Sequence, residues 1–443
     1  MFKRWVVLVL IAVLALGLVP AVGAQATPTV DCGTDQPVNL TFIAGQVGSE
    51  YDVAKSLADM YMKACPNVAV AVVTRPTSTT DTLAQYQQFL AGKSPAIDVF
   101  QIDVAWPSLV AEGMVDMTQY VDQSFLSQFP QGVLDAYTVG GRLVGLPWFV
   151  GTGMLYFRTD LLQKYNLQPP QTWDDLASEA QTIQDGERAA GNKDFWGFVF
   201  QGAAYEGLTC DALEWQVSYG GGKILGSDGT IEVTDANTVE IFDKVASWVG
   251  KIVPPEVLNY QEEDARAVWQ AGNAAFMRNW GYAYPLGQNP DKDGKDPVIK
   301  DKFDVSALPG KTAGMSAATL GGWGVAVSQY SKNVPAAAAF ARWLVDEPQE
   351  VYYTLQRGEQ PAMTAVYQNQ DVLAKLPYIG KFQNVLQVAT PRPTVVSGDK
   401  YATVSQDYYT AVHDVLAGNK DAQTAMSDLE LQLADLGFKP PAS

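Results

Sequence analysis

The feature that most restricts the fold is a regular alternation of strand-like and helix-like segments near the start of the chain. Strands are predicted over residues 38–44, 68–73 and 97–104, and helices over residues 50–64 and 80–91 lie between them. The second strand is almost continuously apolar, as expected in a sheet that is covered on both faces. Three strands joined by helices within about 65 residues predict a parallel α/β sheet with right-handed crossovers.

The alternation resumes after a junction at residues 145–162, GLPWFVGTGMLYFRTDLL. Its Gly-Leu-Pro start predicts a turn that presents Trp148 and Phe149, and a Gly-Thr-Gly break follows before a buried strand at 154–157. Paired aromatic residues on a chain that leaves one compact unit and enters another indicate a ligand cleft between two lobes. Rings beside a turn can equally belong to a core.

The rest of the chain predicts further strands and helices. Strands are expected at 196–201, 274–277, 304–308 and 324–328, and helices at 172–185, 211–219, 233–250, 335–346 and 421–436. The chain is too long for one hydrophobic core and suits two lobes of roughly 200 residues each.

The N-terminus has the pattern of an export signal. Lys3 and Arg4 precede an apolar run over residues 6–19, and small residues follow before Gln25. We therefore assign residues 1–24 to a signal peptide. The mature protein is then expected outside the cytoplasm, in a periplasm or at the outer face of the cell membrane.

Three cysteines remain after the signal. Cys32 precedes the first strand and Cys65 ends the first helix, and these two points can lie close together in a βα unit. A Cys32–Cys65 disulfide is therefore possible in an oxidising compartment. Cys210 is expected to be a buried free thiol. The sequence holds no CxxC or paired-histidine spacing, so we expect neither a metal site nor a cofactor.

Composition narrows the classes of ligand. The net charge of −18 argues against nucleic acid, whose phosphates require basic surfaces. Charged residues make up only 18% of the chain, whereas aromatic residues make up 11%. Such a composition is typical of carbohydrate-binding proteins, because aromatic faces cover the C–H faces of sugars.

Catalysis finds little support in the sequence. The single histidine, His413, lies in a helical stretch and is expected at the surface, and no GxSxG, phosphate-binding or dinucleotide-binding motif occurs. A glycosidase needs only two carboxylates, so composition leaves that class open.

Polar and aromatic side chains instead follow several predicted strands, where open α/β sheets bind ligands. Glu50, Arg75 and Asp103 follow the first three strands in turn. Trp280 and Trp323 lie beside Gly, Asn and Tyr rather than aliphatic residues, which favours a site over a core. Simpler roles remain open: Asp103 can cap a helix and Arg75 can form a surface ion pair.

Seven segments carry a resemblance to a known family. They are RPTSTTD at 75–81, IDVFQIDVAWPS at 97–108, the junction at 145–162, YEGLTCDALEW at 205–215, AAFMRNWGYAY at 274–284, LGGWGVAV at 320–327 and PRPTVVSGDKYATVS at 391–405. In this order they resemble the extracellular solute-binding proteins of ABC importers, in the maltose/trehalose-type branch (family 1). The resemblance covers nearly all of the mature chain.

The family implies an α/β fold of two Rossmann-like lobes, periplasmic-binding-protein-like of type II, joined by a hinge with a ligand cleft between them. Lobe 1 would comprise residues 30–144 and 273–348, and lobe 2 residues 145–272 and 349–443. The implied sugar-contacting positions are Glu50, Arg75, Asp103, Trp148, Phe149, Trp280, Tyr282, Gly321, Gly322, Trp323 and Arg392.

One position departs from the family pattern. Many relatives place an aspartate after the junction aromatics, where this chain has Gly151. One expected hydroxyl acceptor is therefore missing, which puts the identity of the sugar in doubt. Glu206 is one candidate to replace it.

The resemblance implies a monomeric binding protein, not an enzyme, that captures a di- or oligosaccharide and delivers it to an ABC permease. Two alternatives remain. The same scaffold could bind a polyamine or a glycerol phosphodiester, although Arg75 and Arg392 disfavour a polycation. The other alternative is a secreted glycosidase.

Overall fold

The computed structural model describes residues 30–387 and 389–441. The predicted signal peptide, residues 1–24, lies outside the described residues. Within them, no helix combines the length and the apolar character that crossing a membrane requires.

A six-stranded mixed sheet contains the first three predicted strands. Its order is β12-β6-β11-β3-β1-β2. The strands are β1 (Val38–Ala44), β2 (Val68–Thr74), β3 (Val99–Asp103), β6 (Leu146–Thr152), β11 (Leu320–Val327) and β12 (Gln360–Pro361). β1 pairs in parallel with both β2 and β3, which confirms the predicted parallel unit. β11 runs antiparallel to both β3 and β6.

Helices on both faces cover this larger sheet. They are α1 (Glu50–Ala64), α2 (Thr79–Ala91), α3 (Pro107–Val110), α4 (Gln123–Leu126), α5 (Gln131–Ala136), α12 (Val334–Leu344), α13 (Glu347–Arg357), α14 (Gln370–Lys375) and α15 (Tyr378–Gln387). α1 buries Val53, Leu57 and Tyr61 at helical spacing. Two acidic residues in its first turn, Glu50 and Asp52, complement the positive end of the helix dipole.

A second, smaller sheet has four strands in the order β10-β7-β9-β8. Its strands are β7 (Met154–Arg158), β8 (Trp196–Val199), β9 (Ala274–Asn279) and β10 (Phe303–Ser306). The remaining α-helices are α6 (Thr159–Tyr165), α7 (Trp173–Ala189), α8 (Glu206–Ser218), α9 (Ala236–Ala246), α10 (Glu262–Gln270), α11 (Ala283–Gln288), α16 (Thr394–Ser397), α17 (Tyr401–Leu416) and α18 (Ala422–Asp435). A short hairpin of β4 (Thr138–Val139) and β5 (Arg142–Leu143) stands apart from both sheets.

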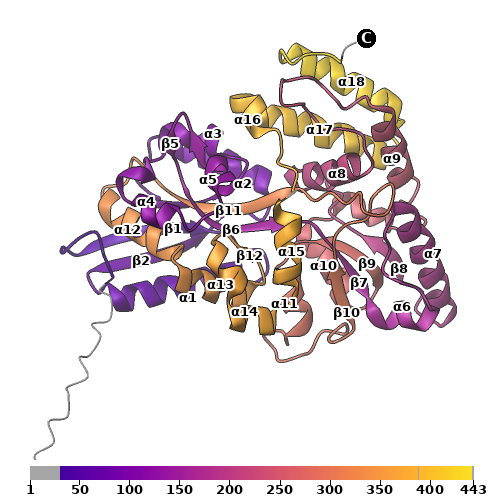
Figure 1. The fold of residues 1–443 in the computed structure, drawn as a ribbon, viewed down its shortest axis with the longest axis horizontal. Helices are drawn as coiled ribbons and strands as arrows, with labels where there is room; N and C mark the ends of the chain where they lie inside the picture. Colours follow the sequence, from indigo (N-terminus) through magenta and orange to yellow (C-terminus); the bar gives the residue numbers. More distant parts are fainter. Residues whose placement is uncertain (1–29, 388, 442–443) are drawn as a thin grey trace, which may run out of the picture.

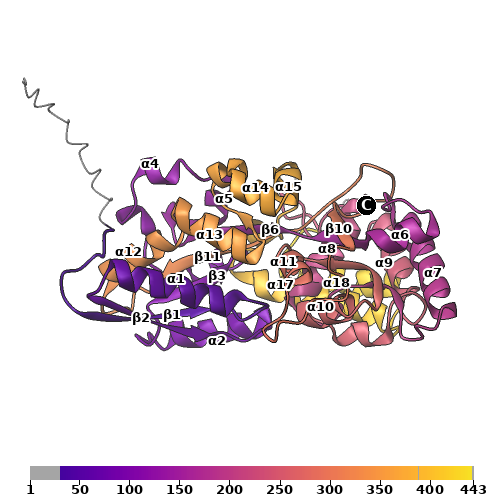
Figure 2. The ribbon, with the colours of Figure 1, turned by 90° about the horizontal axis from the view of Figure 1, so that it is seen from below.

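The two sheets lie side by side. In Figure 1 the larger sheet with α1 and α12 is at the left, and the smaller sheet with α6 and α7 is at the right. Figure 2, turned by 90°, keeps the same separation. One cluster of buried apolar side chains fills the larger sheet and continues onto the smaller one, where it includes Tyr156, Met277 and Phe303. A second cluster contains the other side chains of the smaller sheet, such as Leu155, Phe198 and Phe276.

The junction at 145–162 folds differently from the prediction. The expected Gly-Leu-Pro turn is part of strand β6, which is buried along its whole length. Pro147 has no N–H to donate, and the register of β11 against β6 shifts between Trp323 and Gly324, beside Pro147. This irregularity lets a proline lie inside the sheet.

The sheets also cross the predicted lobe boundaries. β6 and β12 were expected in lobe 2 but belong to the larger sheet, whereas β9 and β10 were expected in lobe 1 but pair with β7 and β8. The chain therefore passes between the sheets at Gly153, between β10 and β11, and after α15. Pairing between strands that are distant in the sequence decides which sheet each strand joins. The order of segments along the chain does not reveal this.

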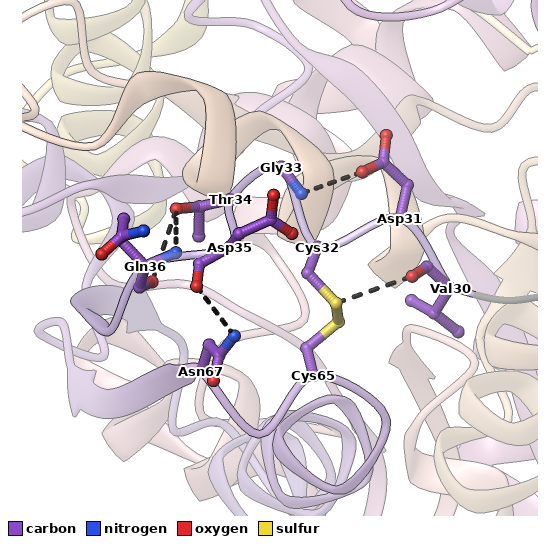
Figure 3. The surroundings of a disulfide bond; sticks show 9 residues. All are labelled: Val30, Asp31, Cys32, Gly33, Thr34, Asp35, Gln36, Cys65 and Asn67. Atoms are coloured by element: carbon purple, nitrogen blue, oxygen red, sulfur yellow. Dashed lines mark hydrogen bonds between the residues drawn. A yellow bond between two sulfur atoms is a disulfide. The ribbon is translucent and has the colours of Figure 1, made fainter.

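Cys32 and Cys65 form the expected disulfide, with 5.6 Å between their Cα atoms. Figure 3 shows the bond joining the segment before β1 to the end of α1. It closes a loop with a sequence separation of 33 residues. Cys210 is a buried free cysteine, also as expected.

Candidate functional site

A pocket of about 690 Å³, a volume that includes space open to solvent, is lined by residues from the larger sheet and from segments next to the smaller one. Ten predicted residues line it: Glu50, Arg75, Asp103, Phe149, Trp280, Tyr282, Gly321, Gly322, Trp323 and Arg392. The other lining residues are Val47, Thr77, Thr79, Gly151, Glu206, Gly207, Cys210, Glu262, Arg357 and Glu359. The structure thus brings together in one cavity residues that lie more than 300 positions apart in the chain.

Trp148 is the predicted site residue that the structure places elsewhere. Its side chain is fully buried in the core, with its ring centroid 4.5 Å from Tyr353 and 5.9 Å from Phe42. Successive side chains of a strand point to opposite faces. Because β6 is a strand and not a turn, Phe149 lines the pocket while Trp148 does not.

Glu50 anchors a polar cluster at the end of β1. Its Oε1 accepts a hydrogen bond from Gln101 Nε2 at 2.6 Å, and its Oε2 lies 3.5 Å from Arg75 Nη2. Both side chains of the pair are 2% exposed. The Arg75 guanidinium also lies over the Trp323 ring, 3.8 Å from its centroid. Arg75 therefore forms a buried pair and supports an indole, rather than forming a surface ion pair.

Arg392 connects the two sides of the pocket. Its Nη2 donates to Asp103 Oδ1 at 2.6 Å, and its Nη1 donates to Glu206 Oε1 at 2.7 Å. Burial opposes the charge of Arg392, but Asp103 and the neighbouring groups outweigh burial and raise its pKa well above the usual value. Asp103 Oδ1 also accepts from Ala105 N at 2.8 Å, but this bond lies in the turn before α3, whose N-cap residue is Trp106, so Asp103 does not cap that helix.

Glu206 already accepts hydrogen bonds at both carboxylate oxygens. Its Oε1 accepts from both Arg392 and Tyr401, and its Oε2 accepts from Ser405 Oγ at 2.6 Å. These three bonds leave Glu206 less acceptor capacity for replacing the aspartate missing at Gly151.

Trp280 rests on a buried arginine. The Arg278 guanidinium lies 4.0 Å from the centroid of the Trp280 ring. Its Nη2 donates to Glu214 Oε1 at 2.6 Å, and Asp211 and Gln201 each hold a further nitrogen at 3.0 Å. Sequence reasoning missed this support, because Arg278 and its three partners come from β9, α8 and the segment after β8.

Two glycines of β11 make room for the pocket aromatics. A Cβ on Gly321 would lie 2.9 Å from Trp280 Cζ3. Gly322 has a φ of +126°, a conformation that other residues rarely adopt, and a Cβ there would lie 2.5 Å from Phe149 O. The LGGWG segment is therefore part of strand β11, and its glycines allow the pocket aromatics to approach the backbone closely.

Arg357 and Glu359 also line the pocket, although the sequence analysis did not single them out. Arg357 ends α13, donates from Nη1 to Val47 O at 2.7 Å, and lies over the Tyr282 ring, 5.2 Å from its centroid. Glu359 immediately precedes β12. That strand has only two residues, too few for an alternating pattern, so no strand end could be predicted there from which to infer a site.

The described residues contain no cluster of histidine, cysteine or carboxylate side chains suited to a metal ion. His413 lies on α17, where Nε2 is 3.1 Å from Leu258 O, and it does not line the pocket. What the pocket offers is a set of aromatic faces beside hydrogen-bonding groups whose charges largely compensate one another.

Comparison with known proteins decides the family. Residues 45–351 match the family model of bacterial extracellular solute-binding proteins. The chain belongs to this family. Its members are solute-binding proteins of transporters and not enzymes, and the expected type II periplasmic-binding-protein fold is confirmed.

Individual relatives and solved structures agree with this family assignment. A probable ABC transporter-binding protein of Deinococcus radiodurans is 41% identical over 424 residues, which cover 96% of this chain and 97% of that protein. Maltose-bound MalE3 of T. maritima superposes with a TM-score of 0.84 at 34% identity, covering 90% of this chain and 99% of that one. The sn-glycerol-3-phosphate-binding protein UgpB of Escherichia coli is 27% identical over 312 residues, which cover 64% of this chain and 66% of that protein.

Proposed function

We propose that this protein captures a di- or oligosaccharide of the maltose or trehalose type outside the cytoplasm and delivers it to an ABC permease. The observation that carries the proposal is the composition of the pocket wall. Phe149, Trp280, Tyr282 and Trp323 supply rings for the apolar faces of sugar units, and charged groups between them can hydrogen-bond hydroxyls. The similarity to a maltose-bound protein supports the same ligand class.

The ion pairs of the pocket favour an uncharged ligand. Each lining arginine lies 3.5 Å or less from a carboxylate: Arg75 from Glu50, Arg357 from Glu359, and Arg392 from Asp103. No lining arginine is free to neutralise a phosphate, which argues against a glycerol phosphodiester despite the similarity to UgpB. The three arginines also place positive charge on the pocket wall, which disfavours a polycation.

Residues from both sheets line the pocket, so a ligand bound there contacts both sides at once. We propose that the two lobes close on the sugar by a hinge movement, because a ligand that contacts both lobes only in the closed state shifts the population towards that state. The closed monomer would then dock on the permease, and parting of the lobes would release the sugar.

Titration calorimetry of the mature protein tests this function. The titrants are maltose, maltotriose, trehalose, ribitol, spermidine and glycerol 3-phosphate. We expect a disaccharide or trisaccharide to bind with a dissociation constant in the micromolar range, about −8 kcal/mol, and the two charged compounds not to bind. Binding of spermidine or glycerol 3-phosphate alone would contradict the proposal.

A further inference from the structure

Glu359 is one of two pocket carboxylates, with Glu262, that accept no hydrogen bond from the described protein groups. Glu359 is 4% exposed and lines the pocket. Its nearest cationic partner is Arg357, whose Nη2 lies 3.5 Å from Glu359 Oε1. Within the described part of the chain, no hydrogen bond reaches either of its carboxylate oxygens. Glu50, Asp103 and Glu206, by contrast, each accept at least two hydrogen bonds from protein groups.

The backbone places this carboxylate opposite Gly151. β12 pairs antiparallel with β6, with Gln360 opposite Val150 and Pro361 opposite Phe149. Continuing this register by one residue sets Glu359 against Gly151. A Cβ built on Gly151 would lie 3.8 Å from Glu359 Oε2 and 3.7 Å from Trp280 Cε3. The space in front of Gly151 is therefore occupied by the Glu359 carboxylate, beside the Trp280 ring.

A second glycine keeps the carboxylate in this position. A Cβ on Gly281 would lie only 3.3 Å from Glu359 Oε2 and 2.5 Å from Gly358 O. Glycine at positions 151 and 281 thus leaves room for the Glu359 side chain to reach the pocket. Glycine in place of aspartate at position 151 leaves the space that the Glu359 carboxylate occupies.

We propose that Glu359 accepts a hydroxyl hydrogen of the bound sugar, in the place that an aspartate at position 151 would otherwise serve. The inference rests on the proposed saccharide-binding function. A carboxylate beside an indole suits a sugar that stacks on Trp280, because a ring lying on the indole turns its equatorial hydroxyls outward to the edge. An ionised acceptor forms a stronger hydrogen bond with a hydroxyl than a neutral one does.

Burial of Glu359 agrees with this role. Desolvation raises its pKa to about 7, Arg357 opposes the rise, and the charge of Glu50 adds to it. Sugar hydroxyls would replace the missing solvation of the carboxylate, so the protein gains most from a ligand that donates hydrogen bonds at this point.

Calorimetry of matched variants tests the proposal, with whichever of maltose, maltotriose and trehalose binds the wild type most tightly. We expect Glu359→Gln to lower the affinity about tenfold or more, because it removes the charge of the acceptor. Glu350→Gln is the control: Glu350 is 1% exposed and accepts a hydrogen bond from Met363 N at 2.9 Å, but it does not line the pocket. This control should change the affinity less than about twofold.

A rescue experiment separates a ligand contact from a structural role. In a Glu359→Ala background, Gly151→Asp returns a carboxylate to the same space from the opposite strand, and a Cβ at 151 meets only ordinary contacts. We expect the double variant to bind about fivefold or more tightly than Glu359→Ala alone. In the wild-type background, Gly151→Asp should weaken binding, because two carboxylates then repel each other, whereas Gly151→Asn should weaken it less.

The outcomes are distinct. If the wild type binds a sugar and Glu359→Gln binds it equally well, the role of Glu359 is wrong while the proposed function stands. Equal losses in Glu359→Gln and Glu350→Gln, or no rescue by Gly151→Asp in a variant with a cooperative thermal transition, would also overturn it. If the wild type binds none of the three sugars, the proposed function fails and this role fails with it.

Discussion

Arg392 Nη2 lies 2.6 Å from Asp103 Oδ1, which joins the segment that follows α15 to the end of β3 in the larger sheet. The same guanidinium reaches Glu206 at the start of α8, so one buried cation holds a carboxylate from each side of the pocket. These three residues therefore link the two sides of the pocket through protein groups alone.

Removal of this cation should destabilise the protein strongly. Arg392→Met leaves Asp103 and Glu206 buried without a counter-charge, and we expect the free energy of unfolding to fall by about 3–5 kcal/mol. Urea denaturation followed by circular dichroism measures the loss. Lys420→Met is the control, because it removes a half-exposed pair with Asp428 and should cost less than about 1 kcal/mol. Similar small effects in both variants would contradict the role of Arg392.

Two indoles should carry much of the sugar affinity. We expect Trp280→Ala and Trp323→Ala each to weaken binding by more than ~1 kcal/mol, because each removes a stacking surface. Trp196→Ala is a matched control: Trp196 also packs against an arginine, with the Arg188 guanidinium 4.4 Å from its ring centroid, but it does not line the pocket. Calorimetric affinities that are unchanged in both pocket variants would refute the site assignment.

Because Trp148 lies in the core, its substitution should lower stability but not sugar affinity. Trp148→Phe should lower the free energy of unfolding by about 1–3 kcal/mol, because it shrinks a fully buried side chain that packs against Phe42 and Tyr353. Sugar affinity should stay within about twofold of the wild type, since the ring does not line the pocket. Denaturation and calorimetry on the same preparation distinguish the two effects. A large loss of affinity with unchanged stability would place Trp148 at the ligand after all.

The pH dependence of the free energy of unfolding should reveal the raised pKa of Glu359. Its pKa of about 7 in the folded protein exceeds its ordinary value of 4.5, so the folded state holds a proton that the unfolded state releases between these pH values. The wild type should therefore lose stability relative to Glu359→Gln as the pH rises from about 4.5 to about 7, by up to about 3 kcal/mol. Below pH 4.5 this penalty is absent. Unfolding measured without ligand across this range checks the sign, and a constant difference between the two proteins would contradict the raised pKa.

The disulfide should stabilise the fold by restricting the conformations of the unfolded chain. A cross-link that closes a loop of this length removes chain entropy worth about 4 kcal/mol in the unfolded ensemble. The double variant Cys32→Ser/Cys65→Ser should be less stable by a similar amount, and reductant should destabilise the wild type but not the variant. Equal sensitivity to reductant in both proteins would exclude this bond as the cause.

The fold class followed from local patterns. Strand β1 and helix α1 begin and end where the periodicity of apolar residues predicts, because one element alternates every second residue and the other every third or fourth. Strand ends also located most of the pocket, since Glu50, Arg75 and Asp103 follow three adjacent strands.

The errors arose where pairing between distant segments overrides local preference. Pro147 and the glycines of the junction predict a turn and a break, yet residues 146–152 form strand β6 because they pair with β11 on one side and β12 on the other. That pairing turned Trp148 into the core. Glu359 escaped notice for the same reason, because its place depends on a two-residue strand that exists only against β6.

Sequence alone determined the α/β character, the cysteine pair and the types of residue available to a ligand, because these depend on composition and on contacts between neighbours in the chain. Only the tertiary structure decided which sheet each strand joins, which carboxylate each pocket arginine pairs with, and which side chains line the pocket. Those outcomes depend on distances between residues far apart in the sequence, and such distances are set when the whole chain packs.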